Sequence, residues 1–276
     1  MAITAQMVKE LRELTGAGMM DCKKALSETD GDQEKAIMYL REKGLSKAAK
    51  KAGRATSEGF VGSSVTDKVA VMVELQSETD FVAKNEAFQS FANGLAEKIA
   101  AAAPKGELPA ELADVSSLIA TLGENMQVGK FVRFELAKTG CYGCYIHSTG
   151  KLGVLVELET EAGCAPEVQE LARDIAMQVA AMPPVCLCPA DLPQDKLEQE
   201  KALYLKQAMD EGKPEAIAEK IVLGRVNKYY KEVCLTEQQF IKDDKKTISG
   251  VIKDVAKKVG KDIAITRYHR LAVGEA

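Results

Sequence analysis

The sequence predicts an α+β protein made of a small three-helix unit, a duplicated mixed core and a helical-hairpin insertion. Apolar residues recur at helical spacing through residues 1–54. From about residue 55 the pattern changes to strand, strand, helix and strand, and it recurs later in the chain. Inside the second copy, residues 189–230 carry two charged amphipathic helices joined by a glycine–proline turn.

The amino-terminal unit is expected to be compact and built from three helices. Thr4 has the side chain of a helix N-cap, and the glycines of 15–18 separate the first helix from the second. Residues 29–32 form the next turn. We expect the third helix to end at Gly44, because glycine commonly terminates helices, and residues 47–57 to form a connector.

Two adjacent methionines, Met19 and Met20, open the second helix of this unit. Successive helical side chains point about 100° apart, so the two cannot both face one core. We expect one of them to be exposed, and exposed methionine suits a surface that contacts another protein. The glycines before them lack the spacing of a nucleotide-binding fingerprint and follow no strand, which favours a helix–helix turn.

The core repeats within the chain. Residues 151–161 are identical to residues 68–78 at six positions. The apolar face of the following helix and the closing strand also recur: Leu171, Ile175 and Val179 correspond to Phe91, Leu95 and Ile99, and 266–268 to 132–134. We therefore divide the core into a first subdomain, 55–140, and a second subdomain, 141–188 with 231–276.

The residues Thr79, Asp80 and Phe81 occur only in the first copy, because the second copy is three residues shorter at this point. An element that the second copy omits is not needed to build the scaffold. Phe81 lies seven residues before Phe88, so on one continuous helix both would face the core. The alternative is a displayed tip, in which Asp80 complements the helix dipole and Phe81 anchors a partner. The residues leave both interpretations open.

The insertion at 189–230 is interpreted as an antiparallel helical hairpin, or coiled coil. Residues 195–209 and 215–223 are the expected helices, and 211–214 is the turn between them. The two helices are highly charged, which leaves few apolar residues to pack between them. We expect a thin core, and hence an element that is mobile or meets a partner.

The charge and the apolar content of the chain argue against a nucleic-acid binder and against a membrane protein. The net charge of −4 argues against a dedicated nucleic-acid binder, which normally carries a basic surface. The one basic cluster, 47–54, is interpreted as a solvated helix end or linker, with RNA contact as the alternative. No apolar run approaches the length of about 20 residues that a membrane span needs, and we find no export signal. We expect a cytoplasmic protein without a membrane partner.

The seven cysteines are expected to be reduced thiols, because their number is odd and no export signal is present. They are Cys22, Cys141, Cys144, Cys164, Cys186, Cys188 and Cys234. A zinc site from the pairs 141–144 and 186–188 is disfavoured, because only one residue separates the second two. A redox role of Cys141 with Cys144 is disfavoured because no helix start lowers a thiol pKa there.

No set of residues points to catalysis. The two histidines, His147 and His269, have no nucleophile at motif spacing, and no carboxylate cluster or histidine pair suggests a metal. We expect a protein that is not an enzyme and that uses neither a cofactor nor a metal.

Residues 11–26 and 79–85 resemble the two signature segments of bacterial elongation factor Ts. The order of a small helical domain, a duplicated core and a coiled-coil insertion is also similar to that family, so the resemblance covers nearly the whole chain. It implies a guanine-nucleotide exchange factor that binds elongation factor Tu in its GDP form and promotes GDP release, without itself binding nucleotide. Many family members carry a further helix after the last strand, whose contacts we do not expect here.

The resemblance also implies site residues. Thr79, Asp80, Phe81 and Val82 match the tip that dislocates the partner's Mg²⁺, with Asp80 and Phe81 intruding near its phosphate site. Further contact positions of the family match Met19, Met20, Lys23 and His147. The amino-terminal unit is similar to the ubiquitin-associated (UBA) three-helix fold. The competing hypothesis is a ribosome- or RNA-associated protein that uses residues 47–54.

Overall fold

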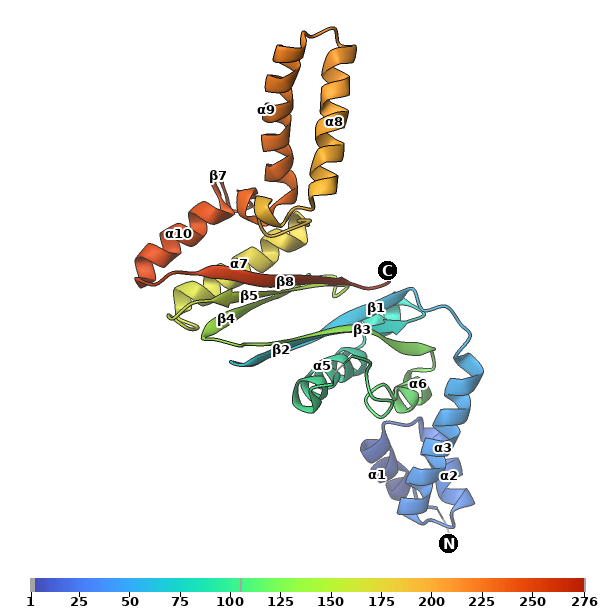
Figure 1. Cartoon of the computed structure of the whole chain (residues 1–276). Helices are drawn as coiled ribbons and strands as arrows, with labels where there is room; N and C mark the ends of the chain where they lie inside the picture. Colours follow the sequence, from blue (N-terminus) through green and yellow to red (C-terminus); the bar gives the residue numbers. More distant parts are fainter. Residues whose placement is uncertain (1–2, 105, 276) are drawn as a thin grey trace.

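The computed structural model describes residues 3–104 and 106–275, except for the side chain of Lys47. The described chain mixes helices and strands, which confirms the α+β class. In Figure 1 the amino-terminal helices, the layered core and a projecting hairpin follow one another from the bottom to the top of the molecule. None of the helices in the described ranges is long and apolar enough to cross a membrane.

Three helices form the amino-terminal unit, as predicted: α1 (Ala5–Thr15), α2 (Met19–Glu28) and α3 (Gln33–Lys51). Thr4 caps α1, since its side chain accepts a hydrogen bond from the Met7 backbone N–H. Leu11, Cys22 and Leu26 are fully or almost fully buried where the helices meet. The unit therefore has a small apolar core of its own.

The predicted end of the third helix at Gly44 is wrong, because α3 continues to Lys51. Gly44 is buried against α6 (Ser116–Leu122), where a Cβ atom would lie 3.4 Å from both the Ala120 Cβ and the Ser116 carbonyl oxygen. The glycine thus allows two helices to approach closely and does not terminate one. This contact joins the amino-terminal unit to the first core subdomain.

Each core copy is a three-stranded antiparallel sheet with one long helix on its outer face. The first copy has the sheet order β1-β2-β3, and the second has β4-β5-β8. The first copy consists of β1 (Glu58–Val65), β2 (Val69–Ser77), α4 (Asp80–Ala83), α5 (Glu86–Ala102) and β3 (Met126–Glu135). The counterparts in the second copy are β4 (Gly140–Ile146), β5 (Leu152–Glu159), α7 (Pro166–Ala181) and β8 (Ala264–Ala272). The repeat seen in the sequence is therefore a repeat of structure.

The helix lies equally close to the sheet in both copies, because a glycine occupies the contact point. A Cβ on Gly62 of β1 would collide with the Ala92 carbonyl of α5. A Cβ on Gly143 of β4 would collide in the same way with the Ala172 carbonyl of α7. Glycine is required at both places, since the backbones themselves are in contact.

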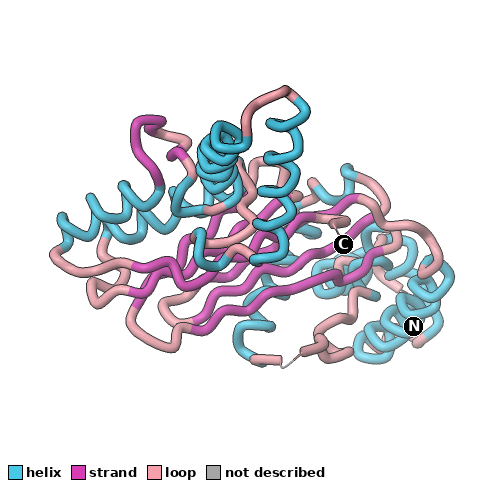
Figure 2. Tube along the Cα trace, turned by 45° about the horizontal axis from the view of Figure 1, so that its top comes forward, coloured by secondary structure: helices cyan, strands magenta, loops and turns pink. Residues whose placement is uncertain are grey.

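The two sheets pack face to face, with α5 and α7 on the outside (Figures 1 and 2). Their shared layer includes Met72, Phe134, Tyr142, Leu155 and Leu271. The central strands β2 and β5 are buried over most of their length, since a helix covers one face and a sheet the other. This explains why their sequences alternate only loosely between apolar and polar residues.

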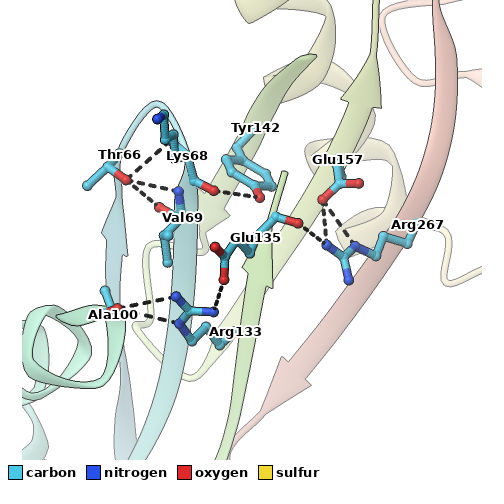
Figure 3. A network of polar contacts seen from close by, with 9 residues as sticks. All are labelled: Thr66, Lys68, Val69, Ala100, Arg133, Glu135, Tyr142, Glu157 and Arg267. Carbon is cyan, nitrogen blue, oxygen red and sulfur yellow. Dashed lines mark hydrogen bonds and ion pairs between the residues drawn. The ribbon is translucent and has the colours of Figure 1, made fainter. Parts of the chain in front are cut away.

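Polar contacts cross between the sheets at the edge of this apolar layer (Figure 3). The Arg267 guanidinium of β8 donates to the Glu157 carboxylate at 2.7 Å and to the Glu135 carbonyl oxygen at 3.0 Å. The Tyr142 hydroxyl donates to the Lys68 carbonyl oxygen at 3.3 Å. The start of β4 therefore lies beside the start of β2.

The predicted hairpin consists of α8 (Gln194–Asp210) and α9 (Glu215–Val233), which project from the core (Figure 1). Its second helix is ten residues longer than the sequence pattern indicated, ending at Val233 instead of 223. Within these helices, Ala208, Ala218 and Val226 are the buried residues. The contact between the helices is thin, as expected.

Several elements between α7 and β8 were not anticipated from the sequence. They are η1 (Pro189–Asp191), η2 (Leu235–Glu237), β6 (Gln239–Phe240), β7 (Asp243–Thr247) and α10 (Ile248–Val259). The α10 helix packs on α7 through residues that include Val251 and Val255. The second copy therefore has a further helix, α10, packed beside its long helix α7.

The expectation of seven reduced cysteines is wrong for one pair, because Cys141 and Cys164 form a disulfide. Their Cα atoms lie 4.8 Å apart, and the bond ties β4 to the loop between β5 and α7. The partners are 23 residues apart in sequence, so the closely spaced pairs 141–144 and 186–188 gave no hint of it. No group of three or more metal-ligating side chains gathers anywhere in the described ranges.

Candidate functional site

The Thr79–Val82 segment forms a short capped helix at the end of β2. Thr79 is the N-cap of α4, and its hydroxyl oxygen accepts a hydrogen bond from the Val82 backbone N–H at 3.4 Å. The Ser77 hydroxyl, at the end of β2, donates to the Thr79 carbonyl oxygen at 3.0 Å. We call residues 79–85 the tip.

Phe81 is displayed at the surface of the tip, with 84% of its area exposed. The helix breaks at Asn85, whose side chain caps α5 by accepting from the Ala87 backbone N–H. Because α4 and α5 are separate helices, Phe81 does not share the buried face of Phe88. The interpretation of Phe81 as a core residue is therefore wrong.

The neighbours of Phe81 point the other way and fix the tip to the body. Ala83 is buried and Val82 half-buried, and both pack in the cluster that holds Phe88. The Gln89 side-chain amide donates to the Ala83 carbonyl oxygen at 3.2 Å. The exposed ring thus stands on a short helix whose opposite side is packed.

Asp80 is paired with Lys84 one helical turn away, with 2.6 Å between the carboxylate oxygen and the ammonium nitrogen. The hydrogen bond from Lys84 lowers the pKa of Asp80 below its usual range, so the carboxylate is charged at neutral pH. Both side chains are well exposed, so the pair contributes little to stability. The tip therefore presents an aromatic ring beside an anion.

The turn that carries His147 lies at the same end of the molecule as the tip. His147 follows β4, its backbone N–H donates to the Leu152 carbonyl oxygen, and its half-buried ring lies 3.0 Å from the Thr149 hydroxyl. Lys151, next along this turn, is ion-paired with Glu58 of β1, and its charge helps to lower the pKa of Asp80. The structure thus brings His147 and the tip to one end of the sandwich.

Met19, Met20 and Lys23 lie on α2 of the amino-terminal unit, apart from the tip. Both methionines are exposed, at 59% and 74%, so the exposure expected for one of them applies to both. The helix buries Cys22, Ala25 and Leu26, and both methionines precede that face. Lys23 is exposed beside them.

Comparison with known proteins decides the family. A protein-family model described as "Elongation factor TS" matches residues 78–275. An elongation factor Ts from Desulfovibrio desulfuricans is 51% identical over 98% of this chain and 98% of its own length. Proteins of the same name from Clostridium perfringens and Lawsonia intracellularis are 50% and 46% identical, covering 99% and 100% of this chain and 93% and 100% of their own lengths.

The chain belongs to the elongation factor Ts family. The resemblance of the two signature segments is thereby confirmed. Membership makes this chain a translation elongation factor of the exchange-factor type. In this elongation factor Ts family member, Phe81, Met19 and Met20 are large apolar side chains that lie exposed at the surface.

In the basic segment 47–54 of this elongation factor Ts family member, some of the charged side chains contact other parts of the same chain. The Lys51 ammonium donates to the Gly123 carbonyl oxygen, and Arg54 forms an ion pair with Glu78 at 3.3 Å. The side chain of Lys47 lies outside the described part of the chain. Two of its cations therefore have structural contacts, which leaves less charge for RNA.

Sequence reasoning missed Glu124, which lies just before β3 and contacts the tip directly. Its carboxylate accepts from both the backbone N–H and the hydroxyl of Thr79. The two residues are 45 positions apart, and no local pattern links them. Only the fold of the chain brings them together.

Proposed function

We propose that this chain binds elongation factor Tu in its GDP form and promotes GDP release, after which GTP rebinds. The observation that carries the proposal is the exposed Phe81 ring on a helix whose other side is packed and capped. Family membership supports the choice of partner. The protein acts in the cytoplasm and consumes no nucleotide itself.

The proposed mechanism is a wedge. GDP in such a partner is held by Mg²⁺ and by backbone donors around the phosphates. Phe81 inserts an apolar surface among the partner elements that hold the metal, and Asp80 adds a charge-assisted hydrogen bond. Thr79 and Val82 hold the wedge in place. Displacement of those elements dislocates the Mg²⁺, and GDP leaves faster.

Thermodynamic linkage makes the effects of the factor and of GDP on each other's binding reciprocal. If the factor weakens GDP binding to the partner, GDP must weaken binding of the factor by the same ratio. The factor therefore binds the nucleotide-free partner best, and incoming nucleotide releases it. No covalent step, cofactor or bound nucleotide is needed on this chain, so the protein is not an enzyme.

Further contacts are proposed for Met19, Met20, Lys23 and His147. The two methionines offer polarisable apolar contact area, and Lys23 adds a positive charge at the same helix start. We assign the amino-terminal unit to the UBA-type fold and the α8–α9 hairpin to a coiled coil. The four-part division at residues 1–54, 55–140, 189–230 and the remaining second subdomain stays our prediction.

The alternative function is RNA or ribosome binding through residues 47–54. It predicts that binding weakens steeply with salt, because counterions are released from the phosphates. The engagement of Lys51 and Arg54 within the fold favours exchange over this alternative.

The test is release of a fluorescent GDP analogue from elongation factor Tu. The native protein should accelerate release, and Phe81→Ala should weaken the effect by about 2 kcal/mol, or roughly thirtyfold at limiting concentration. Leu223→Ala, which truncates an exposed residue on the hairpin, is the matched control and should behave like the native protein. Equal acceleration by the Phe81 variant would remove Phe81 from the mechanism, and no acceleration by the native protein would refute the exchange function.

A further inference from the structure

The root of the α8–α9 hairpin contains three of the cysteines, which the proposed exchange function does not use. Cys186 and Cys188 precede the hairpin, and Cys234 follows it. The thiol of Cys186 donates to the sulfur of Cys234, with 3.4 Å between the two sulfur atoms. Two thiols in contact at the two ends of one projecting element are a candidate disulfide site.

The backbone already holds this pair in a geometry that a disulfide accepts. Cys186 and Cys234 are partners in a parallel β-bridge, and neighbouring strands lie about 4.8 Å apart. That spacing falls within the Cα separations found in disulfides, roughly 4.4–6.8 Å. The Leu235 backbone N–H donates to the Cys186 carbonyl oxygen at 3.0 Å, which fixes the bridge.

A buried amide network keeps the root in place around the thiols. The Gln178 side chain of α7 donates to the side-chain oxygen of Gln238 at 3.1 Å. Gln238 in turn donates to the carbonyl oxygens of Met182 and Glu232 at 3.1 and 3.0 Å. Both glutamines are fully buried. The sulfur atoms need to approach by only about 1.4 Å to bond, without rearrangement of this network.

We propose that Cys186 and Cys234 form a reversible disulfide that joins the two ends of the hairpin, with Cys188 as the thiol that first attacks a small disulfide. Cys186 is 8% exposed and Cys234 not at all, whereas Cys188 is half-buried and within reach of solvent. Burial also raises the pKa of Cys186, and that of Cys234 to about 12, so neither buried sulfur is a ready nucleophile towards solvent.

The chemistry balances as three thiol–disulfide exchanges. The Cys188 sulfur attacks glutathione disulfide and expels one glutathione thiol. Cys186, which lies two residues away in the sequence, then attacks the Cys188 sulfur and expels the second glutathione. Cys234 then attacks Cys186 and releases Cys188 as a thiol. Two cysteine thiols lose two protons and two electrons, and one glutathione disulfide is reduced to two thiols.

The bond would change how the hairpin is attached. The chain enters and leaves the hairpin beside Val185 and Val233, which are joined by a 2.8 Å backbone hydrogen bond. A covalent link beside that hydrogen bond prevents the two crossing segments from separating. Oxidation therefore restricts local opening of the root and the swing of the hairpin relative to the core.

The test uses the full-length protein and glutathione disulfide as the probe. After timed exposure, free thiols are alkylated in denaturant and the peptides are analysed by mass spectrometry without reduction. We expect alkylation of Cys186 and Cys234 to fall in parallel, a peptide linking the two to appear, and Cys144 to stay reactive. Amide hydrogen exchange at Leu235 and Thr236 should slow in the oxidised protein.

Variants separate the two parts of the proposal. Cys234→Ser should abolish the linked peptide, and Cys186→Ser serves if that variant does not fold. Cys188→Ser should slow the reaction by about tenfold or more while leaving the product unchanged. Persistent alkylation of Cys186 and Cys234 while Cys188 becomes fully glutathionylated would overturn the disulfide. An unchanged rate in the Cys188 variant would overturn its role as the first point of attack.

Discussion

The Glu124 carboxylate clamps Thr79 through two hydrogen bonds, at 3.0 Å from the backbone N–H and 2.6 Å from the hydroxyl. The adjacent residues are joined in the reverse direction, because the Asn125 backbone N–H donates to the Glu78 carboxylate at 2.6 Å. The carbonyl oxygen of Gly123, the residue before Glu124, accepts a hydrogen bond from the Lys51 ammonium of α3. A continuous run of contacts therefore connects the amino-terminal unit to the base of the tip.

Replacement of Glu124 should loosen the tip without unfolding the core. In Glu124→Ala the Thr79 N–H loses its acceptor, which costs about 1–3 kcal/mol locally. We expect faster hydrogen exchange at Val82 and Ala83 and a slower maximal rate of GDP release. Both are measured on the same preparation, by exchange mass spectrometry and by the fluorescent GDP assay.

The conservative variant is the control for this clamp. In Glu124→Gln the amide oxygen can accept from the Thr79 N–H and the amide nitrogen can donate to the Thr79 hydroxyl. It should therefore retain most of the native tip protection. If Glu124→Ala and Glu124→Gln protect the tip equally well, Glu124 does not position it.

The two phenylalanines of the tip region should respond oppositely to truncation. Phe88 is fully buried, and Phe88→Ala should lower the free energy of unfolding by about 3–5 kcal/mol. Phe81 is exposed, and Phe81→Ala should change it by no more than about 0.5 kcal/mol. Urea denaturation followed by circular dichroism measures both. A large loss of stability in the Phe81 variant would mean that its ring packs in the folded protein.

The Cys141–Cys164 disulfide should stabilise the second core copy. A cross-link that closes a loop of this size restricts the unfolded chain by roughly 3 kcal/mol. Cys164→Ser should lower the free energy of unfolding by about that amount, and a reductant should do the same to the native protein. Cys144→Ser, on the same strand but outside any disulfide, is the matched control. Equal stability of the Cys164 variant and the native protein would contradict the prediction.

Removal of the hairpin should leave nucleotide exchange largely intact. The α8–α9 helices project from the core, whereas the tip belongs to the first core copy. We expect a protein in which a short glycine-rich linker replaces residues 194–231 to retain a cooperative unfolding transition and most of the GDP-release activity. Loss of activity in a variant that still unfolds cooperatively would show that the site is misplaced.

His269 should make stability depend on pH. Burial, with a smaller contribution from the charge of Lys130, lowers the pKa of His269 in the folded state below its usual 6.5. As the pH falls through 6.5, the unfolded chain therefore binds the proton more readily, and stability decreases until the folded pKa is passed. The His269→Asn variant lacks this titrating group, so its stability should decrease less steeply than that of the native protein as the pH falls through 6.5. Parallel pH profiles of stability from pH 7.5 to about 5.5 would contradict it.

The local part of the candidate site was predictable from sequence, and the rest was not. Thr79 as a cap and Asp80 in a first helical turn follow from residue type and position. The exposure of Phe81 was left open, since seven-residue spacing is compatible with a buried face. Phe81 is exposed because the helix breaks at Asn85, which separates α4 from α5 and caps α5.

The sequence by itself determined the α+β class, the duplicated copies, the projecting hairpin and the extra segment in the first copy. These follow from periodicity and self-similarity, which are properties of short stretches of chain. The tertiary structure alone decided that α3 continues through Gly44, that Cys141 pairs with Cys164, and that Glu124 holds Thr79. Each of these depends on residues that are distant in sequence and meet only when the chain folds, so no local pattern encodes them.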